Sequence, residues 1–359
     1  MSIKPDFWRD KRVFLTGHTG FKGSWLVLLL HRLGAVIEGY ALAPPTNPNL
    51  FELAALGELV DSPSGDVRDF ELLRARMAAF GPDIVLHMAA QSVVLRSYSD
   101  PIETYATNVM GTVNVLQAVR GVQKHCAVVN VTTDKVYENR GWAWGYREID
   151  RLGGRDPYSN SKACAELVAR AFHDSFFTES GSGQTVVALA SARAGNVIGG
   201  GDWTPHQLVP DTIEALRKEQ SVVLRHPAAI RPWQHVLDCL SGYMTLAQAL
   251  FEDGRRFGGS WNFGPADEDM QPVSRVVELL GEHWGQSKPW VRDPGQHLHE
   301  EADLRLNSQL SNRELRWRGK LGINEALAWT AQWYKGHFQG ESARRQCIEQ
   351  IDRYLNLQR

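Results

Sequence analysis

The chain has 359 residues, of which 43% are hydrophobic and 22% are charged, and its formal net charge is −2, which is the balance of a globular protein with one large and one smaller domain. No basic stripe is present and the longest apolar run covers only residues 25–30, so we expect neither a nucleic-acid partner nor a membrane span. The four cysteines are far apart, with no Cys-x-x-Cys pair, which argues against a disulfide framework or a metal site.

The first half of the chain alternates short apolar runs with amphipathic stretches. The residues before the first apolar run lack the apolar core of a signal peptide, so we expect a cytoplasmic protein. The alternation predicts strands at 12–16, 35–42, 84–88, 127–132 and 185–192, and helices at 21–33, 69–80, 102–119 and 157–177. Short apolar strands separated by helices indicate an α/β architecture, a doubly wound (Rossmann) parallel sheet covered on both faces.

Beyond the last of these strands the alternation ends. Gly, Pro and Trp become frequent there, as in residues 199–203. We predict a dinucleotide-binding domain at 1–194 and a smaller, mixed substrate-binding domain at 195–359, with later segments near 232–250 packing back on the first domain. Two such domains are expected to share one cleft.

A glycine-rich turn joins the first strand to the first helix. Its glycines permit a tight turn, a close approach of the backbone to a pyrophosphate and close packing of the helix, whose N-terminus attracts the anion. Because the turn lies between a strand and a helix near the N-terminus, it predicts dinucleotide binding. We expect the cofactor to contact Gly17, Thr19, Gly20, Phe21, Lys22 and Gly23.

The identity of the dinucleotide is encoded less clearly. The second strand runs out at residues 40–44 without the carboxylate that often binds the ribose of NAD, and without an arginine for the 2′-phosphate of NADP. We expect NAD, and NADP stays open. Asp66, followed by Val67, comes after a strand-like stretch, and its carboxylate either accepts the adenine amino group or belongs to a turn or helix start.

Tyr158 and Lys162 stand four residues apart on one face of the helix that Pro157 opens. A neighbouring positive charge favours tyrosinate, so we expect a lowered tyrosine pKa and a base that takes a proton from an alcohol. Residues 132–135 follow the fourth strand, at the carboxyl edge where ligands of open α/β sheets bind. The two segments are therefore expected to face one cleft.

These two segments together resemble the extended short-chain dehydrogenase/reductase family, and the resemblance covers nearly the whole chain. It implies that Tyr158 is the catalytic base, that Thr133 is its partner hydroxyl, and that Lys162 also binds the cofactor ribose. It implies that the chain forms a homodimer or a homotetramer. It further implies cofactor contacts from the turn after the third strand, at Ala89, Ala90 and Gln91.

Asp134 and Lys135 add an acid and a base that a sugar epimerase of this family does not need. A 4,6-dehydratase must also eliminate water, which calls for a general acid and a general base near C6 and C5 of the hexose. The pair resembles that of the sugar-nucleotide 4,6-dehydratases, although those acting on dTDP-glucose carry Asp-Glu at these positions. Lys135 therefore leaves the base for the C5 proton open, and a strand-end salt bridge is the alternative.

Longer runs resemble one branch of these dehydratases, whose substrate is CDP-glucose. They cover residues 17–25, 142–148, 156–162, 193–203 and 230–236. The resemblance implies a lyase that oxidises CDP-glucose at C4, removes water across C5 and C6 and returns the hydride to C6, using tightly held NAD and yielding CDP-4-keto-6-deoxyglucose. Asn196, Arg231 and His235 are the candidate substrate-binding residues, and the Arg231 guanidinium suits the diphosphate unless it packs on Trp233.

Other interpretations use part of the same evidence. A UDP-N-acetylglucosamine 4,6-dehydratase or a nucleotide-sugar 4-epimerase would use the same base and cofactor with another sugar or another outcome. A catalytically silent dinucleotide-binding protein would lack at least one of Thr133, Tyr158 and Lys162, and all three are present.

Overall fold

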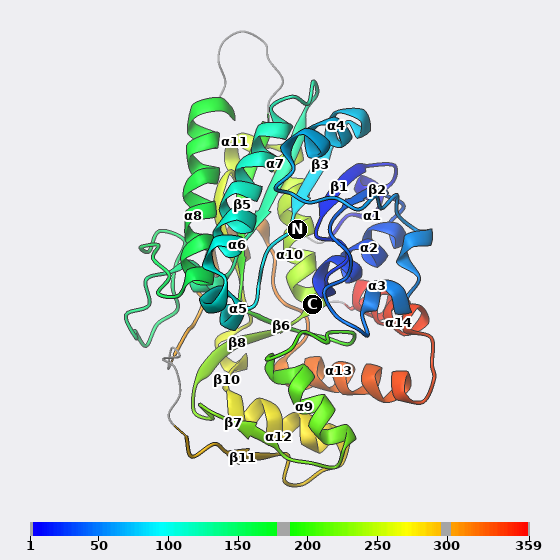
Figure 1. Cartoon of the computed structure of the whole chain (residues 1–359), viewed down its shortest axis with the longest axis vertical. Helices are drawn as coiled ribbons and strands as arrows, with labels where there is room; N and C mark the ends of the chain where they lie inside the picture. The colour runs from blue at the N-terminus through cyan, green and yellow to red at the C-terminus, as the bar shows by residue number, and fades with distance from the viewer. Residues whose placement is uncertain (1–2, 178–186, 296–302, 358–359) are drawn as a thin grey trace.

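A six-stranded parallel sheet forms the centre of the molecule in the computed structural model, which describes residues 3–177, 187–295 and 303–357 (Figure 1). All neighbouring strands of this sheet are parallel. In spatial order the strands are β2 (Val36–Tyr40), β1 (Arg12–Thr16), β3 (Ile84–His87), β4 (Cys126–Val131), β5 (Val187–Ala194) and β9 (Gly259–Phe263). The predicted doubly wound α/β fold is confirmed.

Helices cover both faces of the sheet, because successive strand residues point to opposite sides and both sides are apolar. Val13 and Leu15 of β1 pack into one core, and Phe14 packs into the other. The first core contains α2 (Phe21–Arg32), α10 (Val236–Glu252) and α14 (Ala343–Asn356). The second contains α4 (Phe70–Phe80), α7 (Gly111–Val119) and α8 (Pro157–Phe172).

The later part of the chain builds two small sheets below the central one in Figure 1. The first has β10 (Met270–Pro272), β8 (Ile230–His235) and β6 (Asn196–Ile198), and the second pairs β11 (Trp290–Arg292) with β7 (Val222–Leu224). They are accompanied by α9 (Leu208–Arg217), α12 (Val273–Trp284) and α13 (Ile323–Phe338). Between β8 and β10 the chain returns to the central sheet, where α10 packs on β4 and β5, and β9 extends the sheet. The domain division at residue 194 stays a prediction.

Short helices complete the molecule: α1 (Pro5–Trp8), α3 (Leu50–Leu53), α5 (Val94–Ser99), α6 (Pro101–Tyr105) and α11 (Gly254–Phe257). The other elements predicted for the first half are present within a few residues, and the first two residues of the strand predicted at 185–192 lie outside the described residues. Within the described residues, no helix combines the length and the apolar character needed to cross a membrane.

Two predicted helices are less regular than expected. The helix predicted at 102–119 begins as α6, widens into a π-helical segment at Ala106–Met110 and continues as α7. The helix predicted at 157–177 ends in a second π-helical segment, His173–Phe177. Such widened turns have no period that a sequence pattern would reveal, and they occur often at functional sites.

The order of the strands indicates at which edge of the sheet ligands are expected to bind. β1 lies between β2 and β3, so the direction of the chain's progress across the sheet reverses at this strand. Ligands of open α/β sheets bind beyond the carboxyl ends of the strands at such a reversal. The glycine turn follows β1 at this edge, and residues 132–135 follow β4 at the same edge.

Candidate active site

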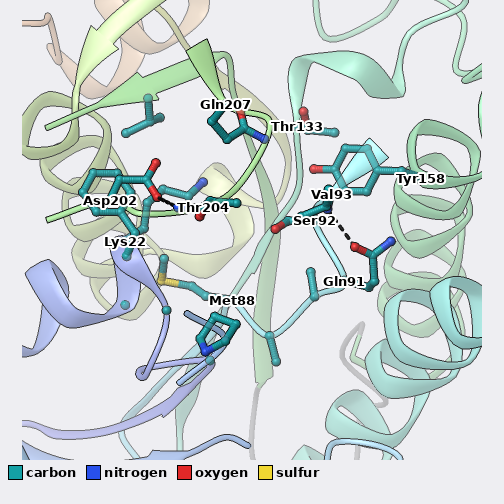
Figure 2. Close-up of a pocket in the computed structure, with 18 of the residues that line it drawn as sticks. Lys22, Met88, Gln91, Ser92, Val93, Thr133, Tyr158, Asp202, Thr204 and Gln207 are labelled. Atoms are coloured by element: carbon teal, nitrogen blue, oxygen red, sulfur yellow. Dashed lines mark hydrogen bonds between the residues drawn. The ribbon is translucent and has the colours of Figure 1, made fainter. Parts of the chain in front are cut away.

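A cavity of about 830 Å³ opens at the carboxyl ends of β1, β3 and β4 (Figure 2). Its walls contain every predicted catalytic residue, namely Thr133, Asp134, Lys135, Tyr158 and Lys162. They also contain every predicted cofactor-binding residue: Gly17, Thr19, Gly20, Phe21, Lys22, Gly23, Asp66, Val67, Ala89, Ala90, Gln91, Tyr158 and Lys162. Segments far apart in the sequence thus meet around one space.

The three glycines of the turn differ in what surrounds them. Gly17 has a φ of 75°, and a Cβ added there would lie 2.7 Å from the amide nitrogen of Ala89. A Cβ on Gly23 would overlap the carbonyl oxygen of Gly17, so α2 packs directly on the turn. At Gly20 the nearest atom would be the same oxygen, 3.6 Å away, which leaves the approach from the cavity open. The open backbone at a helix N-terminus fits a pyrophosphate.

Asp66 lies on the cavity wall but already has a partner. Its carboxylate accepts from the Arg68 guanidinium, with 2.5 Å between Oδ2 and Nη2, and from the Arg68 backbone N–H at 2.9 Å. The hydrogen bond to Arg68 lowers the pKa of Asp66. The carboxylate is therefore ionised at neutral pH, and its contact with adenine stays a prediction.

Asn108, which sequence analysis missed, joins the turn at residues 89–91 to α8, the helix that carries Tyr158 and Lys162. Its Oδ1 accepts from the Gln91 backbone N–H at 2.9 Å, and its Nδ2 donates to the Gln91 carbonyl at 3.0 Å and to the Ser161 hydroxyl at 2.9 Å. The residue is fully buried in the π-helical segment. Only the position of that segment in space reveals its role.

Lys162 is buried beneath the cavity, and its Nζ donates to the carbonyl of Val131 at 2.9 Å. Burial and, to a smaller extent, the charge of Lys22 lower the pKa of Lys162 to about 7, although Glu166 opposes the change. An ammonium held by a backbone carbonyl is poised between its charged and neutral forms near neutral pH.

The side chains of Tyr158 and Thr133 both lie at the cavity in Figure 2, and Thr133 acts on the pKa of Tyr158. The prediction of a lowered tyrosine pKa is wrong for the protein alone. Burial raises the pKa of Tyr158 far above its usual value, Asp134 adds to the rise, and Thr133 only partly opposes it. The cost of burying a phenolate outweighs the effect expected from a lysine four residues away.

Asp134 is a buried acid with an incomplete set of partners. Its Oδ1 accepts from the Thr133 hydroxyl at 3.0 Å, and its Oδ2 is buried without a hydrogen-bond partner among the described residues. Burial raises the pKa of Asp134, against the lowering effects of Lys135 and Arg231. A carboxyl group in this environment favours its neutral form, which can donate a proton.

The remaining predicted residues fall into two groups, those that line the cavity and those that do not. Lys135 is half-buried on the wall, and Asn196 lines it as well. Arg231 and His235 are not among the described residues that line the cavity. Arg231 Nη1 donates to the Ile230 carbonyl at 2.8 Å, while His235 is fully buried and its Nδ1 accepts from the Leu237 N–H at 3.2 Å.

The wall contains polar residues outside the predicted site, among them Asp202, Thr204 and Gln207, drawn in Figure 2. Asp202 Oδ1 accepts from the Thr204 backbone N–H at 2.9 Å, and Lys22 acts on the same carboxylate. Burial raises the pKa of Asp202. The unusual 199–203 run was visible in the sequence, but nothing in it indicated that this carboxylate would face Lys22.

The arrangement combines a phenol–hydroxyl pair, a buried acid and two lysines beside a turn suited to a dinucleotide. The described residues contain no group of three or more His, Cys, Asp and Glu side chains placed to bind a metal ion. Hydride transfer to a dinucleotide needs a proton acceptor for the alcohol, and elimination of water needs a proton donor for the leaving hydroxyl. This cavity can serve both steps on one sugar.

Comparisons with known proteins give the relatives of this chain. Residues 14–328 match the family model described as GDP-mannose 4,6 dehydratase. CDP-glucose 4,6-dehydratase of Salmonella typhimurium is 52% identical over 339 residues, which cover 94% of each chain. A structure of dTDP-glucose 4,6-dehydratase from Streptomyces venezuelae, solved with NAD and TYD bound, has a TM-score of 0.75 and 26% identity, covering 93% of this chain and 99% of that one.

Fold alone does not separate the possible activities. An epimerase structure from Methanothermobacter thermautotrophicus has a TM-score of 0.79 at 20% identity, covering 95% of this chain and 96% of that one. The residues that distinguish a dehydratase from an epimerase therefore have to be sought in the site, where Asp134 and Lys135 lie beside Tyr158.

Proposed function

The chain belongs to the GDP-mannose 4,6-dehydratase family, and from this membership we propose that it is a lyase that converts CDP-glucose to CDP-4-keto-6-deoxyglucose with NAD as its cofactor. The observation that carries the proposal is the buried acid Asp134, which lines the same cavity as Tyr158 and the glycine turn. The choice of CDP-glucose rests on the Salmonella relative, which is 52% identical across 94% of both chains.

Cofactor binding falls to the glycine turn and Lys162 in this proposal. The turn offers backbone N–H groups to the pyrophosphate, and Lys162 binds the ribose. When bound, the oxidised nicotinamide supplies a positive charge and accepts the hydride from C4, which it returns to C6. Because a nearby cation lowers the pKa of a phenol, Tyr158 reaches its proton-accepting form more easily in the loaded enzyme than in the protein alone.

The chain's own residues move the protons. Tyr158, held by Thr133, takes the proton of the C4 hydroxyl as C4 becomes a ketone, which acidifies the hydrogen on C5. We assign removal of the C5 proton to Lys135, which lines the cavity and accepts the proton as a neutral amine, becoming the ammonium that later returns a proton to C5. Asp134 gives its proton to the C6 hydroxyl, which leaves as water. A proton returns to C5 as the hydride reaches C6, so the sugar loses one water and is neither oxidised nor reduced overall.

Asn196, Arg231 and His235 are the proposed substrate-binding residues, and of these Asn196 is among the described residues that line the cavity. Asn196 lines the cavity and offers an amide to the nucleotide sugar. The charge of Arg231 lowers the pKa of Asp134, although Arg231 is not among the described residues that line the cavity. We therefore keep the interaction of Arg231 with the diphosphate as part of the proposal. His235 is supported least, because its ring lies between Trp25 and Trp329, with centroids 6.2 and 5.7 Å away.

Incubation with four nucleotide sugars tests the function. The purified protein, supplied with NAD, is mixed separately with CDP-glucose, UDP-glucose, UDP-N-acetylglucosamine and dTDP-glucose, and the 4-keto-6-deoxy product is detected by its ultraviolet absorbance in base. We expect product from CDP-glucose with the highest kcat/KM. Product from UDP-N-acetylglucosamine alone, or a C4 epimer without a keto sugar, would contradict the proposal.

We also propose that the chain forms a homodimer through α6, α8 and the π-helical segments that continue them, and that it acts in the cytoplasm. α6 packs on α8, and large apolar side chains on these elements are exposed, namely Ile102, Met110, Leu167 and Phe176. The proposed cytoplasmic location rests on the four cysteines, which are all free, as a reducing compartment would leave them. Light scattering tests the assembly: Leu167→Glu should shift the mass toward that of a single chain, and an unchanged mass would contradict this interface.

A further inference from the structure

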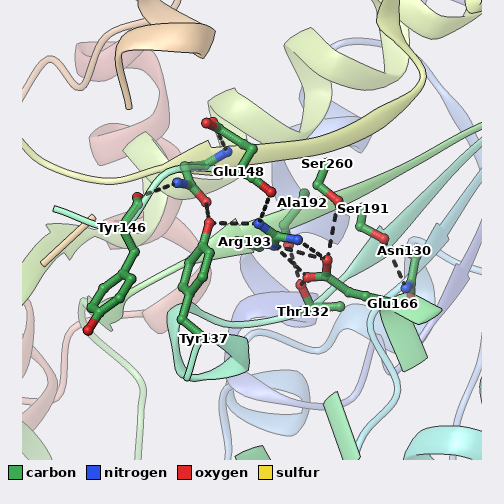
Figure 3. Close-up of polar contacts among 11 residues, drawn as sticks. Asn130, Thr132, Tyr137, Tyr146, Glu148, Glu166, Ser191, Ala192, Arg193 and Ser260 are labelled. Carbon is green, nitrogen blue, oxygen red and sulfur yellow. Dashed lines mark hydrogen bonds and ion pairs between the residues drawn. The ribbon is translucent and has the colours of Figure 1, made fainter. Parts of the chain in front are cut away.

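The strand tip at residues 132–137 contains the catalytic turn and is anchored at both of its ends. Thr133 and Asp134 lie within this segment, which includes the 3-10 turn Asp134–Val136. The anchors are Thr132 on one side and Tyr137 on the other, and both bind a single buried ion pair between Glu166 and Arg193 (Figure 3). Neither Glu166 nor Arg193 is among the described residues that line the cavity, so the pair lies behind its wall, on the inner side of the segment.

Glu166 is fully satisfied by hydrogen bonds from three elements. Its Oε1 accepts from the Thr132 hydroxyl at 2.6 Å and from Arg193 Nε at 2.8 Å. Its Oε2 accepts from Arg193 Nη2 and from the Ser260 hydroxyl of β9, the latter at 3.2 Å. Both charged side chains are only 2% exposed. This carboxylate therefore joins the end of β4 to β5 and β9.

Arg193 completes the second anchor. Its Nη1 donates to the Tyr137 hydroxyl at 2.7 Å and to the Glu148 carbonyl at 3.2 Å, and the Tyr137 hydroxyl donates to Asn262 Oδ1 at 2.7 Å. Hydrogen bonds to the Glu166–Arg193 ion pair therefore hold both ends of the catalytic turn. Figure 3 shows Arg193 between Tyr137 and Glu166.

The position of Glu166 on its helix connects the anchors to the catalytic base. Tyr158, Lys162 and Glu166 follow one another at intervals of four residues on α8, so they lie along one face of the helix. The helix that carries Tyr158 and Lys162 is therefore joined through Glu166 to the strand tip that carries Thr133 and Asp134. A buried ion pair is an expensive way to gain stability, but its geometry is specific.

We propose that Glu166 is a positioning residue of the reaction: with Arg193 it holds the Thr133–Asp134 turn in register with Tyr158 and Lys162. The inference rests on the proposed function for its catalytic consequence and on geometry alone for the anchoring. Errors of about 1 Å in such an alignment cost up to roughly a hundredfold in rate.

Three variants that each remove one hydrogen bond from the pair separate positioning from stability. Thr132→Val and Tyr137→Phe remove the two anchors, and Ser260→Ala removes a bond to the same carboxylate that does not hold the turn. We expect the anchor variants to lose roughly tenfold or more in kcat with little change in KM, and Ser260→Ala to keep the wild-type kcat. Thr132→Ser, which keeps the hydroxyl, should recover most of the kcat.

Amide hydrogen exchange gives a readout that does not need a substrate. In the whole protein, residues 133–137 should exchange faster in Thr132→Val and Tyr137→Phe than in Ser260→Ala, while the rest of the sheet exchanges alike in all three. Equal exchange and equal kcat in all three variants would overturn the inference. A wild-type protein that turns over none of the four nucleotide sugars would instead contradict the proposed function, and the exchange result would still decide whether the anchors hold the turn.

Discussion

The two sides of the strand tip at 132–137 bury charges with opposite consequences. On the inner side, burial alone would lower the pKa of Arg193, but the charge and hydrogen bonds of Glu166 raise it above its usual value. On the cavity side, burial dominates: it raises the pKa of Asp134 and lowers that of Lys162 to about 7. One pair is kept charged, and the other two groups are shifted toward neutrality.

The difference lies in the partners rather than in the burial. Glu166 and Arg193 satisfy each other, whereas Asp134 has one oxygen without a partner among the described residues and Lys162 donates to a backbone carbonyl. A buried charge with a full set of partners fixes geometry, and a buried group without them is shifted toward its neutral form. The fold thus separates positioning from proton transfer across one strand.

Asp134→Asn tests the cavity side and should have the largest effect on activity. The variant keeps the shape of the side chain but has no proton to give, so kcat should fall roughly 10²- to 10⁴-fold. Its stability toward urea should stay the same or rise, because a group that resists ionisation is replaced by a neutral one. Steady-state kinetics and urea unfolding measure the two effects. A wild-type kcat would show that Asp134 is not the acid.

Glu166→Gln tests the inner side and should act first on stability. It leaves the Arg193 guanidinium buried without its counter-ion, which costs about 3–5 kcal/mol in unfolding free energy. Glu214→Gln is the surface control, since it removes the ion pairs of an exposed carboxylate with Arg217 and Lys218, where Glu214 is 47% exposed, and should cost about 1 kcal/mol or less. Equal losses for the two variants in urea unfolding would mean that the inner pair contributes no more than a surface pair.

Sequence reasoning reached the members of the cavity side and the role of Asp134 as an acid, but not the pKa of Tyr158. Tyr158 and Lys162 could be paired because a spacing of four residues places them on one helix face, and Asp134 because strand ends of a parallel sheet meet at one edge. The pKa of Tyr158 was predicted in the wrong direction, because the depth of burial is a property of the packed structure. The fold class followed from the alternation of strands and helices, which is local.

The Glu166–Arg193 ion pair could not be predicted from the sequence, for a physical reason. Glu166 and Arg193 are 27 residues apart and become partners only when β5 is placed beside β4. Nothing in the pattern around either residue indicates a buried charge, since both side chains belong to types that usually lie on the surface. Asn108 was missed in the same way, because it works from a π-helical segment that breaks the helical period.

The pH dependence of stability sharpens the comparison through Lys162. Its pKa is about 7 in the folded protein and 10.5 is its usual value, so the unfolded chain binds more protons between these pH values. Stability should therefore rise with pH from about 7 to 10.5, by at most about 1.4 kcal/mol per pH unit, and be lost as the pH falls toward 7. Lys162→Met should flatten this rise. Urea unfolding of the cofactor-free protein at several pH values measures it, and identical slopes in both proteins would contradict the assignment.

The glycine turn shows a similar contrast between packing and ligand binding. Gly23 packs tightly within the fold, and Gly20 is open toward the cavity. A Cβ at Gly23 would overlap the Gly17 carbonyl oxygen, so any side chain there disturbs the packing of α2, whereas Gly20 has room. Gly20→Ala should therefore leave unfolding unchanged and weaken NAD binding about tenfold, because the methyl group occupies the approach of the pyrophosphate. Gly57→Ala, with open space around it, is the control and should change neither quantity. Calorimetric titration with NAD measures the affinity, and a Gly20→Ala protein that binds as tightly as wild type would place the pyrophosphate away from this turn.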